Sequence, residues 1–171
     1  MRLWHRIEEV FPNIAGLDSV WTIGRVTLDP GGPSIIPGGA EMLFQFRDAD
    51  QQILNQLHGA LVEIVNEFDA EGPCPVTLEI MSQSNPAIMA PSTRNCVLEA
   101  AQALAPKHYR VMPSGAGHDA QIIAPHIPSA MMFVPSIGGI SHHWSENTSD
   151  EDLMLGVQIY VDAIARILES H

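Results

Sequence analysis

Residues 113–152 hold the side chains with the clearest capacity for chemistry. This stretch contains four of the eight histidines, two glycine-rich turns and an acidic helix start. A strand-like run at residues 130–134 ends in a glycine-rich turn, so His142 follows the carboxyl end of a predicted strand, where ligands bind in open α/β sheets. Because neutral imidazole is a common ligand of zinc-like metals, His142 is a candidate metal ligand. The alternative is that His142 and His143 form a surface pair hydrogen-bonded to the loop.

Two further features could bind a carboxylate. The turn Gly115-Ala116-Gly117 exposes successive backbone N–H groups, which can hold an anion, although it could also be a simple tight turn. Arg47 ends a predicted strand, where its guanidinium could clamp a carboxylate through two hydrogen bonds. The alternative for Arg47 is a solvated charge at a strand edge.

Signatures of other chemistry are missing from the sequence. It contains neither Gly-x-Ser-x-Gly nor a Walker loop, and the Gly-x-Gly at Gly115 lacks the third glycine of a dinucleotide fingerprint. What remains is metal-assisted hydrolysis or a non-catalytic binding module.

Composition narrows the class of protein. The 171 residues, 46% hydrophobic, can build one domain or two small ones. A net charge of −12 opposes binding to nucleic acid and to anionic membranes. The two cysteines, Cys74 and Cys96, indicate neither a disulfide framework nor a thiolate zinc site. The start lacks the apolar core of a signal peptide and no run is suited to span a membrane, so we expect a cytoplasmic protein.

Hydrophobic periodicity places these residues on elements. The first half reads as a helix from Leu3, two strands at residues 20–28 and 40–47, a helix capped by Asp48 or Asp50, and a third strand at residues 76–80. This order predicts an antiparallel sheet with helices on one face. After a loop near residues 84–91, the second half reads as a helix from Ser92 or Thr93, short strands at residues 109–112 and 130–134, and a helix with a capping box at residues 148–151.

Five motifs together resemble one family of enzymes, and they cover nearly the whole chain in the family's order. They are Gly24-Arg25, residues 33–38 (PSIIPG), Phe46-Arg47-Asp48, residues 114–120 (SGAGHDA) and residues 139–146 (GISHHWSE). The chain resembles the hydantoinase/carbamoylase family of amidohydrolases, which includes N-carbamoyl-L-amino-acid hydrolases, allantoate amidohydrolases and β-ureidopropionases. That family is related to the dinuclear zinc aminopeptidases and aminoacylases.

The resemblance implies an α/β fold with an α+β part. Residues 1–88 would be a partial lid and dimerisation domain, and residues 89–171 the C-terminal part of a dinuclear-metallohydrolase catalytic domain. By similarity, His142 is the last metal ligand of a site for a divalent metal (zinc, manganese, cobalt or nickel). The similarity also assigns contacts with a small ureido or amide carboxylate substrate to Arg47, Gly115, Ala116 and Gly117. Ser34 stands where the family usually has Asn, so its contact differs in reach.

The resemblance also implies that the chain is incomplete as an enzyme. The family's N-terminal half, which carries the other metal ligands and the general base, has no counterpart here, so no catalytic residue is assigned in this chain. Because a catalytic zinc needs about three protein ligands, we expect no activity without that half. The expected partner is a complementing N-terminal polypeptide or a second copy in a homodimer. The alternative is a non-catalytic dimerisation or small-carboxylate-binding module derived from the lid.

Overall fold

A long antiparallel hairpin organises the first part of the chain. In the computed structural model, which describes residues 2–170, strand β1 (Val20–Asp29) pairs along its length with β2 (Gly39–Arg47). The first residue of β1 lies opposite the last residue of β2, and the register shifts once, at Gly24. A glycine within a strand often marks such a bulge. Both strands were predicted from the sequence, and both are confirmed.

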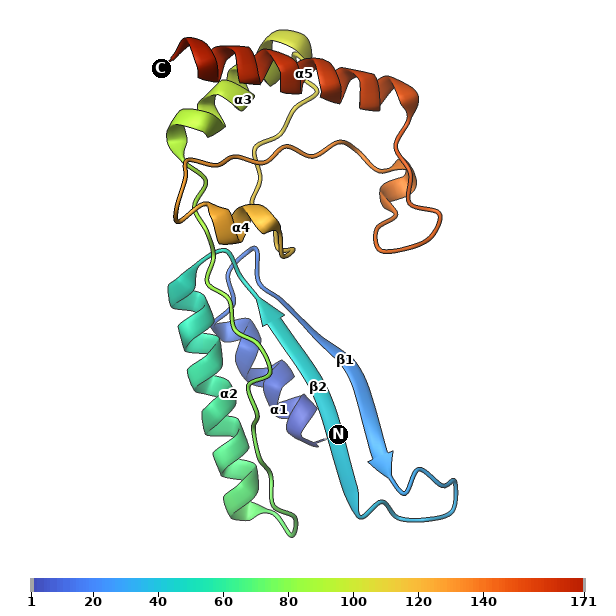
Figure 1. Cartoon of the computed structure of the whole chain (residues 1–171). Helices are drawn as coiled ribbons and strands as arrows, with labels where there is room; N and C mark the ends of the chain where they lie inside the picture. Colours follow the sequence, from blue (N-terminus) through green and yellow to red (C-terminus); the bar gives the residue numbers. More distant parts are fainter. Residues whose placement is uncertain (1, 171) are drawn as a thin grey trace. The chain divides into compact units, whose positions relative to one another are not determined.

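Helices cover one face of this hairpin (Figure 1). Helix α1 (Arg2–Val10) continues into the 3₁₀ turn η1 (Phe11–Asn13), and helix α2 (Gln51–Glu71) packs beside it. The fully buried side chains come from these helical segments, and alternate residues of β2 pack against them, as the period-2 pattern predicts. The fully buried residues of this cluster are Ile7, Phe11 and Leu57, and the β2 residues are Met42, Phe44 and Phe46.

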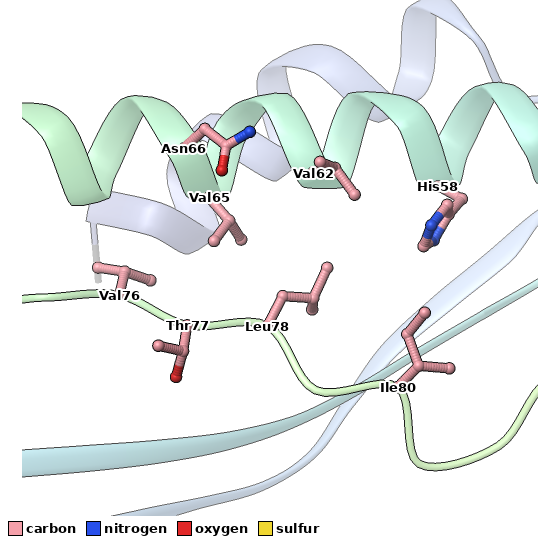
Figure 2. A pocket seen from close by; sticks show the side chains of 8 residues that line it. All are labelled: His58, Val62, Val65, Asn66, Val76, Thr77, Leu78 and Ile80. Carbon is pink, nitrogen blue, oxygen red and sulfur yellow. The ribbon is translucent and has the colours of Figure 1, made fainter.

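The run at residues 76–80 is extended, but the prediction of a third strand there is wrong. Figure 2 shows Val76, Leu78 and Ile80 pointing toward α2 and Thr77 pointing away, which is the side-chain alternation of a strand. The groove between this run and α2 has a volume of about 440 Å³. Within residues 2–170 the backbone of residues 77–82 has no backbone hydrogen bond, and a strand requires a neighbour for its ladder.

A second group of elements packs around two helices, α3 (Pro91–Leu104) and α5 (Asp150–Glu169). Small residues let the two helices approach closely, and the buried set is Ala100, Ala105, Ile159 and Ala163. Arg166 joins them, donating to Asp162 at 2.7 Å and to Glu99 at 3.3 Å. The hydrogen bond to Asp162, aided by the charges of Asp162 and Glu99, raises the pKa of Arg166.

The starts of these helices refine the sequence prediction. Helix α3 begins at Pro91 rather than at Ser92 or Thr93, because proline suits the first turn, where no N–H partner is needed. Ser149 caps α5: its hydroxyl accepts from the N–H of Asp152 and donates to that carboxylate. The helix start is confirmed, but the capping pair is Ser149 and Asp152, one residue beyond the predicted Thr148-x-x-Glu151, and the Asp152 carboxylate accepts from the Ser149 hydroxyl rather than from a backbone N–H as in a capping box.

Other predictions for the second half are wrong. Residues 109–112 and 130–134 form no strand, and a five-residue helix, α4 (Asp119–Ile123), was not predicted. The described residues contain one sheet, and it is the hairpin. Among the described residues, segments 109–112 and 130–134 therefore have no strand to pair with.

Contacts divide the chain into two compact units. One comprises Met1–Pro86 with Pro113–Gly115, and the other Ala87–Met112 with Ala116–His171. The fold is mixed α/β, with a small antiparallel sheet and helices. The division into a lid at residues 1–88 and a catalytic part at residues 89–171 stays a prediction. Over residues 2–170, no helix combines the length and the apolarity needed to cross a membrane.

Candidate functional site

Arg47 and Gly115, two of the predicted substrate contacts, lie together in the first unit. Arg47 is the last residue of β2, and its Nη1 donates a hydrogen bond to the carbonyl oxygen of Gly115 at 2.8 Å. The turn therefore offers Arg47 a carbonyl acceptor, whereas the sequence suggested only N–H donors. Open space surrounds the position of a Cβ at Gly115. A guanidinium has five N–H donors in a fixed fork, so other donors of Arg47 remain for a carboxylate.

Residues next to Arg47 hold the junction between β2 and α2. Asp50 caps α2 by accepting from the N–H of Gln52 at 2.7 Å, which resolves the choice between Asp48 and Asp50. Asp48 instead accepts from the N–H of Asp50 at 2.7 Å and from the hydroxyl of Ser19. These bonds fix the chain that follows Arg47. Sequence reasoning missed the part of Ser19, because it lies 29 residues from Asp48 and no local pattern links them.

Ser34 lies far from Arg47 in the same hairpin. It sits in the exposed turn that joins β1 to β2, beyond the end where Asp29 pairs with Gly39. Arg47 is at the opposite end, so the length of β2, roughly 26 Å at a strand rise of about 3.3 Å per residue, separates them. Within one chain, the structure does not bring these two predicted contacts to one small molecule.

His142 occupies the tip of a closed loop in the second unit. The N–H of Ile137 donates to the carbonyl of Asn147 at 2.8 Å, which ties the ends of this loop together. Within it, His142 has φ of +56°, a conformation uncommon outside glycine. The carboxylate of Glu146 stabilises this turn by accepting from the N–H of His142 at 2.8 Å.

The two adjacent histidines of this loop differ in what their rings contact. Nδ1 of His143 lies 2.8 Å from the hydroxyl of Ser145, and its ring is 5.4 Å from that of Trp144. No hydrogen bond or ring contact engages the His142 side chain among the described residues, and it is exposed. His143 thus fits the surface role that the sequence left open for both, while the His142 imidazole is available to a ligand.

The remaining predicted positions, Ala116 and Gly117, are exposed in the second unit, just before α4. Gly117 has open space around the position of a Cβ. The ring of His118 lies 5.3 Å from that of Phe133. His118 therefore makes a packing contact in the second unit.

The described residues do not form a complete metal site. Within residues 2–170, no group of three or more His, Cys, Asp or Glu residues is placed to hold a metal ion. A catalytic zinc site uses about three protein ligands, so the residues present do not fit a metal centre by themselves. His142 can supply one ligand at most.

The family follows from comparison with known proteins. The sequence model described as Peptidase family M20/M25/M40 matches residues 6–166, and the chain belongs to this family. The chain is 36% identical over 152 residues to an allantoate amidohydrolase of Escherichia coli (strain K12), covering 81% of this chain and 34% of that protein. It is 32% identical over 149 residues to an N-carbamoyl-L-amino-acid amidohydrolase of Paenarthrobacter aurescens, covering 87% of this chain and 36% of that protein.

Solved structures agree with these relatives. An amidase of the hydantoinase/carbamoylase family from Burkholderia phymatum superimposes with a TM-score of 0.88 at 38% identity, covering 99% of this chain and 40% of that chain. The resemblance to hydantoinase/carbamoylase amidohydrolases that the motifs carry is thereby confirmed. The chain spans about a third of the length of the curated relatives it matches.

Proposed function

We propose that this chain is the C-terminal part of a metal-dependent amidohydrolase that hydrolyses C–N bonds of N-carbamoyl amino acids or related ureido or amide substrates. One observation carries the proposal. The chain superimposes over 99% of its length on 40% of an amidase, yet its described residues hold no group able to bind a metal alone. A polypeptide carrying the rest of the fold would supply the other ligands and the general base. The complete site would take zinc, manganese, cobalt or nickel, and this chain alone would be inactive.

The proposed division of labour follows the two units. Residues 1–88 act as part of a lid and dimerisation domain and present Arg47 to the substrate carboxylate. Residues 89–171 belong to the catalytic domain and present His142 as a metal ligand. Backbone groups at Gly115, Ala116 and Gly117 also contact the substrate. Ser34 lies at the opposite end of the hairpin from Arg47, so it contacts that substrate only from a second copy of the chain in a homodimer.

The exposure of His142 and the closure of its loop support its role. The bond from the His142 N–H to Glu146 holds the backbone of the loop, and it leaves the imidazole unengaged among the described residues. A ligand on a closed loop loses less conformational freedom on binding a metal than one on an open segment.

A matched pair of variants tests the assignment. The chain is mixed with the portion of the Escherichia coli allantoate amidohydrolase that lies outside its match to this chain, and metal content and ammonia release from N-carbamoyl amino acids and allantoate are measured. We expect His142→Ala to lower the metal content and the ammonia release. His143→Ala should leave the metal content unchanged, because the wild-type His143 ring already contacts Ser145 and Trp144. An unchanged metal content in His142→Ala would remove His142 from the site.

The alternative is a binding module without catalysis. The bond between Arg47 and Gly115 forms within the first unit and involves no metal, so a carboxylate could bind there without chemistry. Calorimetric titration of the chain alone with an N-carbamoyl amino acid in the presence of a chelator separates the two. Retained binding with no ammonia release from any mixture would favour the module.

A further inference from the structure

The loop that carries His142 also carries an almost fully exposed tryptophan. Trp144 is 90% exposed, whereas Trp4 and Trp21 pack against the core of the first unit. Trp21 donates its indole N–H to Glu8 at 2.7 Å, but within residues 2–170 no hydrogen bond engages the indole N–H of Trp144. Tryptophan is highly buried on average because its ring carries a large apolar area. The Trp144 ring is therefore free to contact a ligand.

A β-turn places this ring at the tip of the loop. The N–H of Glu146 donates to the carbonyl of His143 at 3.0 Å, which closes a four-residue turn with Trp144 and Ser145 at its two central positions. The central residues form the corner of such a turn, farthest from the segments that it joins. The turn starts directly after His142, so Trp144 lies two residues from the proposed metal ligand.

The neighbouring histidine supports the indole. The rings of His143 and Trp144 lie 5.4 Å apart at an interplanar angle of 41°, within the range of packed aromatic pairs. Nδ1 of His143 accepts from the N–H of Ser145 at 3.3 Å, which ties the imidazole to the backbone of the same turn. A side chain supported in this way loses less conformational freedom when it binds a ligand. Trp144 is exposed, yet its surroundings are ordered.

The chemistry of an indole selects the part of a substrate that it suits. Its ring is a broad apolar surface with one N–H donor. In an N-carbamoyl amino acid the ureido group and the carboxylate are polar, and the side chain is the part that can be apolar. Allantoate has a second ureido group where an amino acid has its side chain.

We infer that Trp144 is a specificity-determining residue that contacts the substrate side chain. It favours N-carbamoyl amino acids with an aromatic or large aliphatic side chain over allantoate. His143 is a positioning residue that supports the indole. This inference rests on the proposed function, which places the substrate beside the loop of His142.

The other candidate occupant is the polypeptide that carries the rest of the fold, which would bury the indole with or without substrate. The surroundings of Trp144 argue against it. Residues 141–143, 146 and 147 are polar and exposed, so the indole is a single apolar group on a polar loop. A protein interface is instead most apolar at its buried centre.

The first test compares two substrates that differ only in the side chain, N-carbamoyl-L-phenylalanine and N-carbamoylglycine. The chain is mixed with the portion of the Paenarthrobacter aurescens amidohydrolase outside its match to this chain. Trp144→Ala should lower kcat/KM about tenfold for the phenylalanine derivative and less than about twofold for the glycine derivative. Trp144→Phe keeps an aromatic face and should retain most of the preference. Leu17→Ala, which removes another exposed apolar side chain in the first unit, should change neither value.

The second test observes the indole without relying on turnover. The chain is labelled with fluorotryptophan and the complementary portion is not, so fluorine NMR reports only the three tryptophans of this chain. Trp144→Phe identifies the resonance of Trp144. We expect this resonance to shift when N-carbamoyl-L-phenylalanine is added to the mixture, and to stay in place when the complementary portion alone is added.

The outcomes separate this inference from the proposed function. An equal loss of kcat/KM for both substrates in Trp144→Ala, or no loss for either, would overturn the inference and leave the proposed function standing. A resonance that moves on adding the complementary portion and ignores the substrate would assign the indole to assembly and also overturn it. A substrate-dependent shift without ammonia release would keep Trp144 as a ligand contact and count against the proposed function alone. Absence of both would refute both.

Discussion

Two glycines in helices should respond in opposite ways to alanine, because their surroundings differ. Gly59 in α2 has no neighbouring atom within 4 Å of the position that a methyl group would take, so Gly59→Ala should stabilise α2 by about 1 kcal/mol through helix propensity. Alanine at position 156 in α5 would bring the same gain in helix propensity, but its methyl group would lie 2.6 Å from Cγ1 of Val134. Valine has a stiff χ1 and such overpacking costs about 1–3 kcal/mol, so Gly156→Ala should be neutral or destabilising by up to about 2 kcal/mol.

Hydrogen exchange measured by mass spectrometry can read the two helices separately, which matters because they lie in different units. The amides of α2 should exchange about fivefold more slowly in Gly59→Ala, since about 1 kcal/mol corresponds to that factor. The amides of α5 should exchange no more slowly in Gly156→Ala than in the wild type. If Gly156→Ala slowed exchange in α5 as much as Gly59→Ala does in α2, residues 130–134 would not lie against α5 as described.

Three further predictions concern single contacts. Asp50→Ala should lower the free energy of unfolding of the first unit, measured in urea, by about 1 kcal/mol, whereas Asp50→Asn should lower it much less because asparagine keeps an acceptor oxygen. Equal losses would mean that the cap does not act through its side-chain acceptor. Glu146→Ala should speed hydrogen exchange at the His142 amide while Glu146→Gln, which keeps an acceptor oxygen, should not; no difference would contradict the closed loop. In the reconstituted enzyme, Arg47→Lys should raise KM about tenfold or more with a smaller effect on kcat, because lysine lacks the bidentate fork; an unchanged KM would remove Arg47 from substrate binding.

Local features of the fold could be predicted from the sequence because they depend on near neighbours. The alternation of Met42, Phe44 and Phe46 identifies the buried face of β2, and the helical spacing from Ile53 to Phe68 identifies α2. Capping residues are local in the same way. The five-residue helix α4 was missed because it is too short to show a period.

Strand pairing could not be predicted in this way. Residues 76–80 and 130–134 have strand-like sequences, but a strand exists only if another strand donates and accepts along its edge. Neither segment has such a neighbour among residues 2–170. Their sequences therefore fit a larger sheet than this chain contains.

The candidate site was predictable in type but not in arrangement. Sequence reasoning left His142 and His143 open to the same surface role, and only the loop contacts of His143 with Ser145 and Trp144 distinguish them. Ser34 and Arg47 belong to neighbouring motifs in the sequence. The register of the hairpin nevertheless puts them at opposite ends, because a strand carries the chain away from its turn.

Metal analysis of the purified chain, alone and with the complementary amidohydrolase portion, tests the central claim most directly. We predict that the chain alone retains less than one equivalent of zinc or manganese and releases no ammonia from N-carbamoyl amino acids, and that the mixture gains both. Stoichiometric metal with measurable turnover in the chain alone would contradict the account.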